Sequence, residues 1–138
     1  MKRTVFLDTN ILIDFLAQRA EFLAAANVMD MAKKGKIDVY ITNLTLANTV
    51  YILRKQLNSQ QATDTIKQLC SFLKIAPSTS KETSFAINTP NPDFEDALQY
   101  ASAVAISADY ILTRNEKHFL FATIPVMTAA QFLSTLDS

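Results

Sequence analysis

The chain has 138 residues, of which 49% are hydrophobic and 19% are charged, an ordinary balance for one globular domain. Its 13 basic and 13 acidic side chains cancel, so the overall charge does not indicate a nucleic-acid partner, and any such binding depends on local patches. Because it has a single cysteine, a single histidine and a single glycine, the sequence excludes an intrachain disulfide, multi-histidine or cysteine zinc sites, and the glycine-rich loops that bind nucleotides.

The first part of the chain alternates short apolar runs with helical patterns. Residues 4–7 are expected to form a buried strand, and residues 11–17 a helix. A second helix over residues 21–34 ends in two lysines followed by Gly35, which is the basic last turn and glycine stop typical of a helix C-terminus. Residues 39–42 are the next expected strand.

Two helices are expected before the third strand, over residues 44–57 and 59–69. The first of them has its apolar residues on one face, namely Leu46, Val50, Leu53 and Leu57. Residues 72–75 form a weak strand candidate, and the polar segment PSTSKETS at residues 77–84 is assigned no element.

The clearest pattern lies between residues 93 and 112. Asp93 is a good N-cap for a helix over residues 94–107, which leads into a strand over residues 110–112. The helix is expected to bury one apolar stripe, consisting of Phe94, Ala97, Leu98, Ala101, Val104 and Ala105. A last short strand within residues 124–128 precedes a closing helix, for which Thr128 and Gln131 form a capping box.

Strands that alternate with helices predict a parallel sheet covered by helices on both faces. Ligands of such sheets bind beyond the carboxyl ends of the strands. We therefore expect the polar residues that follow the strands to mark the functional site.

Several polar residues occupy such positions. Asp8 and Asn10 follow the first expected strand, and Thr113, Arg114 and Asn115 follow the strand at residues 110–112. Helices that begin beside strand ends carry the others, which are Asn48, Asp93, Glu95 and Asp96. If Asp8, Asn48, Asp96 and Asn115 converge, their oxygen atoms suit Mg²⁺ or Mn²⁺, ions that can activate water and stabilise a phosphoryl transition state.

Each of these residues also has a purely structural interpretation. Asp8 can cap the helix that follows it, Asp93 is most simply an N-cap, and Glu95 and Asp96 are favourable charges at a helix N-terminus. Asn48 and Asn115 can satisfy turns. The residues alone leave both interpretations open.

No segment of the sequence has the properties of a membrane span, because none approaches ~20 consecutive apolar residues. Asp8, Asn10 and Asp14 also interrupt the apolar run that a signal peptide needs. We therefore expect a cytoplasmic protein with no membrane partner.

Four blocks, VFLDTNILIDFL, TLANTVYILRK, DFEDALQYASA and ADYILTRNEKHF, occur in the order and spacing of PIN-domain proteins. The sequence resembles the toxin-like prokaryotic branch that includes the VapC ribonucleases, over nearly all of its length. The resemblance implies one PIN-like domain over residues 1–138, a Rossmann-like three-layer α/β/α sandwich with a mostly parallel sheet of about four to five strands. It also implies a Mg²⁺- or Mn²⁺-dependent endoribonuclease acting on single-stranded RNA, with an antitoxin partner and a homodimeric state.

The resemblance assigns roles by position. Asp8 and Asp96 match metal-binding aspartates, and Asn10 supports Asp8 from the same turn. Asn115 falls where the family often carries an acid or an asparagine. Nearby supporting residues are Asp93, Glu95 and Thr113, and the candidate contacts for RNA phosphates are Arg114 and Lys117.

Two positions depart from the family pattern. Asn48 stands where many PIN nucleases have a glutamate, and His118 stands where an aspartate is common. Both changes remove negative charge from the expected metal site, and Asn48 cannot act as a base. The alternative function is therefore a catalytically weak or inactive PIN scaffold that binds RNA or a protein partner. A phosphatase-like hydrolase with Asp8 as nucleophile is a further alternative, but Asn10 stands where such sites have a second aspartate.

Overall fold

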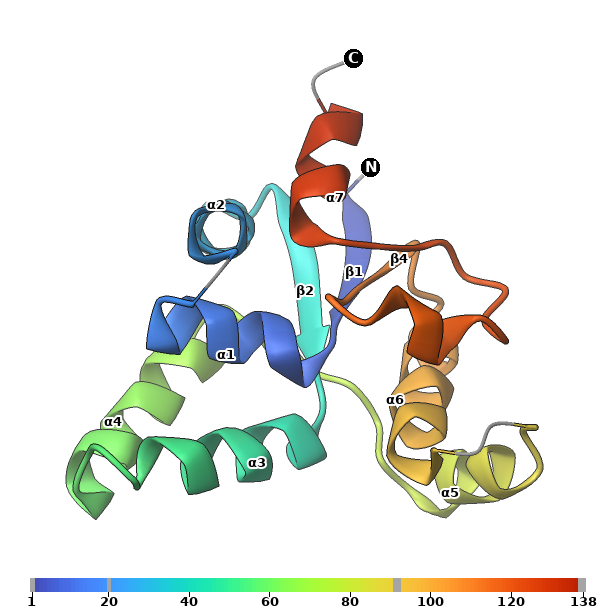
Figure 1. Cartoon of the computed structure of the whole chain (residues 1–138), viewed down its shortest axis with the longest axis horizontal. Helices are drawn as coiled ribbons and strands as arrows, with labels where there is room; N and C mark the ends of the chain where they lie inside the picture. The colour runs from blue at the N-terminus through green and yellow to red at the C-terminus, as the bar shows by residue number, and fades with distance from the viewer. Residues whose placement is uncertain (1, 20, 91–92, 137–138) are drawn as a thin grey trace.

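The computed structural model describes residues 2–19, 21–90 and 93–136 (Figure 1). Within these residues a five-stranded sheet has the strand order β3-β2-β1-β4-β5. The strands are β1 (Arg3–Leu7), β2 (Ile37–Ile41), β3 (Lys74–Ile75), β4 (Tyr110–Leu112) and β5 (Val126–Met127). Every pairing between neighbouring strands is parallel.

Helices cover both faces of the sheet. One face carries α1 (Thr9–Ala17), α2 (Phe22–Lys33), α3 (Asn43–Leu53), α4 (Ser59–Cys70) and α7 (Ala129–Leu136). The other face carries α5 (Ser80–Ile87), α6 (Phe94–Ala105) and the 3₁₀ helix η1 (Glu116–Phe119). The predicted three-layer sandwich with a mostly parallel sheet is therefore confirmed.

The central strand shows how the sequence produces the three layers. Val5 and Leu7 belong to the core under α1, α2 and α7, whereas Phe6 between them belongs to the core under α6. Successive side chains of a strand point to opposite faces, so a strand covered on both faces must be apolar throughout. This explains the unbroken apolar run that precedes Asp8.

Gly35 ends α2 as expected. It has a φ of 71°, its N–H donates to the Ala32 carbonyl at 3.1 Å, and the Lys36 N–H donates to the Met31 carbonyl at 2.9 Å. These two bonds form a Schellman motif, in which glycine accommodates the left-handed conformation.

Helix α3 is shorter than predicted, ending at Leu53 instead of residue 57. Asn58 is the N-cap of α4 and has extended backbone angles, and its side chain and that of Gln61 form a capping box. The chain must leave the helical conformation before such a cap. A turn therefore separates α3 from α4.

Helix α5 begins within the polar segment at residues 77–84, which was assigned no element, and continues to Ile87. Thr79 and Glu82 form a capping box there, with the Thr79 N–H donating to Glu82 Oε1 at 2.7 Å. The helix buries only Glu82 and Ala86, so its sequence lacks the apolar periodicity of a longer amphipathic helix. The Thr-x-x-Glu spacing was the available signal.

The predicted apolar stripe of α6 is wrong in part. Phe94, Val104 and Ala105 are exposed, and the helix ends at Ala105. Its buried residues are Ala97, Gln99, Tyr100, Ala101, Ser102 and Ala103. Because α6 packs against both the sheet and α5, its buried surface is wider than one stripe and includes polar residues. None of the described helices is long and apolar enough to cross a membrane.

Candidate active site

Strands β1 and β4 are neighbours in the sheet, with β2 and β3 following on one side of β1 and β5 on the other side of β4. The strand order therefore reverses between β1 and β4, and the carboxyl ends of these two strands lie side by side. Chain segments leave these two neighbouring strands for opposite sides, which opens a crevice at their carboxyl ends. Asp8 follows β1 and Thr113 follows β4, and the Asp8 N–H donates to the Leu112 carbonyl at 2.9 Å. These two residues form the floor of the candidate site.

Asp8 is nearly buried and held by three hydrogen bonds. Its Oδ1 accepts from the Thr9 N–H at 2.8 Å, which makes Asp8 the N-cap of α1. Its Oδ2 accepts from Thr113 Oγ1 at 2.8 Å and from Asn10 Nδ2 at 3.1 Å. The cap therefore fixes the carboxylate in the crevice, and the structural role of Asp8 does not compete with a functional one.

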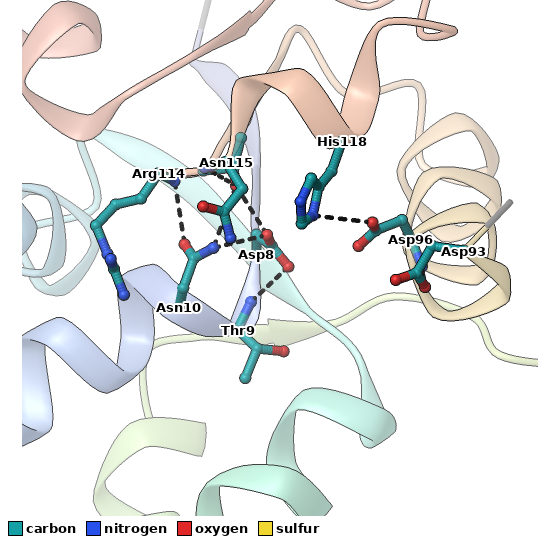
Figure 2. A network of polar contacts seen from close by, with 9 residues as sticks. Asp8, Thr9, Asn10, Asp93, Asp96, Arg114, Asn115 and His118 are labelled. Atoms are coloured by element: carbon teal, nitrogen blue, oxygen red, sulfur yellow. Dashed lines mark hydrogen bonds and ion pairs between the residues drawn. The ribbon is translucent and has the colours of Figure 1, made fainter. Parts of the chain in front are cut away.

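The loop after β4 is joined to the start of α1. Thr113 Oγ1 accepts from the Asn115 N–H at 3.0 Å and from Asn10 Nδ2 at 3.3 Å, while Asn10 Oδ1 accepts from the Arg114 N–H at 3.2 Å. Thr113 is fully buried. Asn10, Thr113 and Asn115 thus brace Asp8 from two segments that are far apart in the sequence (Figure 2).

Asp96 reaches the same crevice from the first turn of α6. Its N–H donates to Oδ1 of Asp93, the N-cap of the helix, at 3.1 Å. Burial, together with the neighbouring carboxylates of Asp93 and Asp8, raises the pKa of Asp96 to about 6. Asp96 Oδ2 is buried and accepts no hydrogen bond from the described part of the chain. A bound cation would stabilise a carboxylate in this environment.

His118 lies against this carboxylate. Its Nδ1 is 3.2 Å from Asp96 Oδ2, and Figure 2 shows the imidazole projecting from η1 into the space between Asp8 and Asp96. The histidine side chain is about half exposed, at 54%. His118 was expected only as a missing acid, whereas the structure makes it a direct partner of Asp96.

Asn48 takes no part in the hydrogen bonds around Asp8 that are described above. It contacts the N-terminus of α6, where its Nδ2 donates to Glu95 Oε1 at 3.1 Å. Asn48 therefore connects α3 with α6 and positions an acidic side chain at the edge of the site.

A buried polar network beneath the site was not predicted. Gln99 is 1% exposed, and its Nε2 donates to Thr45 Oγ1 at 3.0 Å while its Oε1 accepts from Thr42 Oγ1 at 2.7 Å. Thr45 Oγ1 in turn lies 2.8 Å from Thr9 Oγ1. This network joins α6 to the start of α1, so it sets the separation between Asp96 and Asp8. A glutamine inside an otherwise apolar helical segment was the only sequence signal.

Arg114 has a different environment from the one expected of a phosphate contact. Its Nε lies 2.6 Å from Oδ2 of Asp14, an aspartate of α1 that is fully buried. Figure 2 shows the guanidinium turned away from His118 and Asp96. Lys117, by contrast, is exposed on η1, next to His118.

Few side chains at this site could bind a metal ion. Among the described residues, no three side chains of histidine, cysteine, aspartate or glutamate lie close enough together to hold a metal ion. Asp8, Asp93 and Asp96 nevertheless lie in the same region at the carboxyl ends of the strands, and the carboxylates of Asp93 and Asp8 both raise the pKa of Asp96. Such a site fits an ion that draws on two carboxylates and keeps most of its waters, as Mg²⁺ does.

A family model described as PIN domain matches residues 4–117. Similar solved structures include VapBC2 from Rickettsia felis bound to a promoter DNA fragment, with a TM-score of 0.68 and 20% identity over 90% of this chain and 96% of that chain. A toxin-antitoxin complex from Klebsiella pneumoniae has a TM-score of 0.68 and 24% identity, covering 91% of this chain and 97% of that chain. VapC20 from Mycobacterium tuberculosis, described as a toxin that cleaves the sarcin-ricin loop, has a TM-score of 0.63 and 15% identity, covering 88% and 98%. A search of curated proteins returns no significant match.

Proposed function

The chain belongs to the PIN domain family, and on that basis we propose that it is a Mg²⁺- or Mn²⁺-dependent endoribonuclease that hydrolyses phosphodiester bonds in single-stranded RNA. The observation that carries the proposal is the environment of Asp96. This buried carboxylate oxygen accepts no hydrogen bond from the described residues, has only the imidazole of His118 beside it as a possible cation, and lies near two further carboxylates. A bound divalent cation would stabilise such a group.

Asp8 and Asp96 are the proposed metal ligands. When bound, the ion would supply Lewis-acid stabilisation of the charge that develops on the phosphate. Thr113 and Asn10 hold the Asp8 carboxylate in one orientation, and Asp93 fixes the first turn of α6 from which Asp96 projects. Such outer contacts orient ligands and tune their affinity for a metal.

Other residues have supporting roles in the proposal. Asn115 braces the loop after β4, and Asn48 holds Glu95 at the edge of the site, where an acidic side chain adds to the attraction for a cation. Lys117 is the proposed contact for an RNA phosphate. Arg114 forms an ion pair with the buried Asp14, so we assign it a structural role instead of contact with an RNA phosphate.

Cleavage of a fluorophore-quencher single-stranded RNA in Mn²⁺, Mg²⁺ or EDTA tests the proposal. Asp8→Asn and Asp96→Asn should each lower the rate by about 100-fold or more, a loss typical of removing a group that stabilises transition-state charge. Asp64→Asn is the matched control, because Asp64 is an exposed residue of α4. This substitution should leave the rate unchanged. Equal rates in wild type and Asp96→Asn, or full activity in EDTA, would refute the assignment.

A second candidate function is supported by the two departures from the family pattern. Asn48 carries no charge, and His118 Nδ1 lies 3.2 Å from Asp96 Oδ2, where it competes with a metal ion for that oxygen. On this alternative the chain is a PIN scaffold that binds RNA or a protein partner without cutting. Calorimetric titration with Mn²⁺ separates the two, because the scaffold should show neither heat of metal binding nor cleavage while still retaining RNA in a filter-binding assay.

We also propose that this chain is the toxin of a toxin-antitoxin pair, acting in the cytoplasm as a homodimer with an antitoxin partner. The proposal is supported by the fold it shares with the Klebsiella pneumoniae toxin-antitoxin complex and by an exposed Cys70, which suits a reducing compartment. Light scattering of the purified chain tests the dimer. Growth arrest on expression, relieved by a small protein encoded next to the gene, tests the toxin.

A further inference from the structure

A cleft of about 950 Å³ opens directly beside the carboxylates, between the N-terminus of α6 and the segment that contains η1. Asp96 and His118 line both this cleft and the candidate active site. Its volume lies within the roughly 300–1,000 Å³ of ligand-binding clefts. A substrate in the active site would therefore extend into it.

Apolar side chains form much of the cleft. Phe94 is 50% exposed and Leu120 is 84% exposed, although both are large hydrophobic residues. Phe121 lines the cleft from within an aromatic cluster, packed edge-on against Tyr100 with ring centroids 4.9 Å apart. The cleft thus offers an accessible phenyl ring above a firmly packed floor.

The charges in the cleft disfavour a phosphate group. Asp93, Glu95 and Asp96 line it, against a single lysine, Lys117. An uncharged aromatic ligand that donates hydrogen bonds suits this environment. Glu95 accepts one bond from Asn48, and carboxylate oxygens have capacity for further donors.

We propose that this cleft binds the nucleobase next to the scissile phosphate, and that it favours bases with an exocyclic amino group over uracil. The base stacks on Phe94, its amino group donates to Glu95 or Asp93, and Lys117 contacts the adjoining phosphate. The assignment rests on the proposed ribonuclease function for the position of the RNA. Stacking of bases on aromatic side chains is a general means of binding single-stranded nucleic acids.

Fluorescence anisotropy with the labelled hexanucleotides rA₆, rC₆ and rU₆ tests the proposal, with EDTA present to suppress metal-dependent cleavage. Wild type should bind rA₆ and rC₆ several-fold more tightly than rU₆. Phe94→Leu keeps an apolar side chain but removes the aromatic face, and should weaken binding of all three by about fivefold or more. Glu95→Gln should reduce the preference over uracil instead.

Tyr51→Leu is the matched control, since Tyr51 is a 70% exposed aromatic residue on α3 that does not line the cleft. It should bind like wild type. Equal affinities in Phe94→Leu and wild type, equal loss in Tyr51→Leu, the same affinity for rC₆ carrying abasic units, or no RNA binding at all would each overturn the proposal. The abasic result would instead fit binding through the RNA backbone alone, and the absence of RNA binding would fit a protein segment as the occupant.

The two proposals fail in different ways. Normal, Asp96-dependent cleavage with no effect of Phe94→Leu would refute the nucleobase site and leave the ribonuclease intact. Phe94-dependent binding without cleavage in Mn²⁺ or Mg²⁺ would refute the ribonuclease and leave a nucleobase-binding cleft with no scissile phosphate beside it.

Discussion

Arg114→Met should destabilise the protein far more than Asp14→Asn, although both substitutions break the same ion pair. The two partners differ in burial, because the Asp14 side chain is 0% exposed and that of Arg114 is 35% exposed. Removing the arginine leaves a buried carboxylate without its cation. Removing the charge of Asp14 leaves an arginine that water can already reach.

The size of the difference follows from these environments. Stranding a buried charge costs about 3–5 kcal/mol, which is a large share of the roughly 5–15 kcal/mol that stabilises a typical domain. Asp14→Asn keeps an oxygen that can accept from Arg114, so we expect a loss of about 1 kcal/mol. The double variant with both changes should be more stable than Arg114→Met alone, because no buried charge remains.

Urea unfolding at neutral pH measures these free energies, provided that the denaturant slope stays constant among the variants. The exposed pair of Lys34 and Asp30, with Nζ 2.8 Å from Oδ2, provides a matched control. Lys34→Met should leave the free energy of unfolding nearly unchanged, because exposed ion pairs contribute little to stability. A loss below about 1 kcal/mol in Arg114→Met, or equal losses in the two single variants, would contradict the structural role of this pair.

Three further outcomes are expected. In EDTA, Asp96→Asn should be more stable than wild type at pH 7 but not at pH 3.8, because the pKa of folded Asp96 is about 6 against the ordinary value of 3.8. Protonation of Asp96 thus stabilises the wild type fully below pH 3.8, and this stability is lost as the pH rises through about 6, which thermal unfolding across that range would show. Gln99→Leu should cost about 1–3 kcal/mol in urea unfolding, since it removes one hydrogen-bond partner from each of the buried hydroxyls of Thr42 and Thr45. An unchanged midpoint would show that these two bonds do not stabilise the fold. Gly35→Ala should lower the melting temperature by the equivalent of about 1–2 kcal/mol, because alanine disfavours the left-handed conformation of this residue. A clash does not contribute, since an added Cβ would come no closer than 3.8 Å to Lys2 Nζ. An unchanged melting temperature would argue against the Schellman geometry.

The sheet could be predicted from the sequence because its strands are short apolar runs with clear boundaries. The run before Asp8 and the one before Thr113 appeared at the right positions, and the rule that parallel strands bind ligands at their carboxyl ends brought the two residues together. Helix α5 was not predicted because it buries so few residues that its periodicity is weak, and its capping box was the one signal in the sequence that indicated a helix.

The inner connections of the site could not be predicted, because each depends on a partner that is distant in the sequence. Asp14 reads as one polar residue on an apolar helix until Arg114 is placed beside it. Gln99 likewise acquires its role only when Thr42 and Thr45 lie beneath α6. His118 is an ordinary turn residue in the sequence, and its contact with Asp96 follows from the packing of η1 against α6.

The strand order also affects how the protein forms during synthesis. Strand β1 is translated first, and its pairing with β2 can follow soon afterwards, but its other edge pairs with β4, which is made much later. An unpaired edge on an apolar strand attracts other strands, so the growing chain carries an aggregation-prone edge over most of its synthesis. The same delay keeps Asp8 apart from Thr113 and Asp96 until the last third of the chain is available. A ribosome making this protein would therefore not carry the assembled candidate site until the chain is nearly complete.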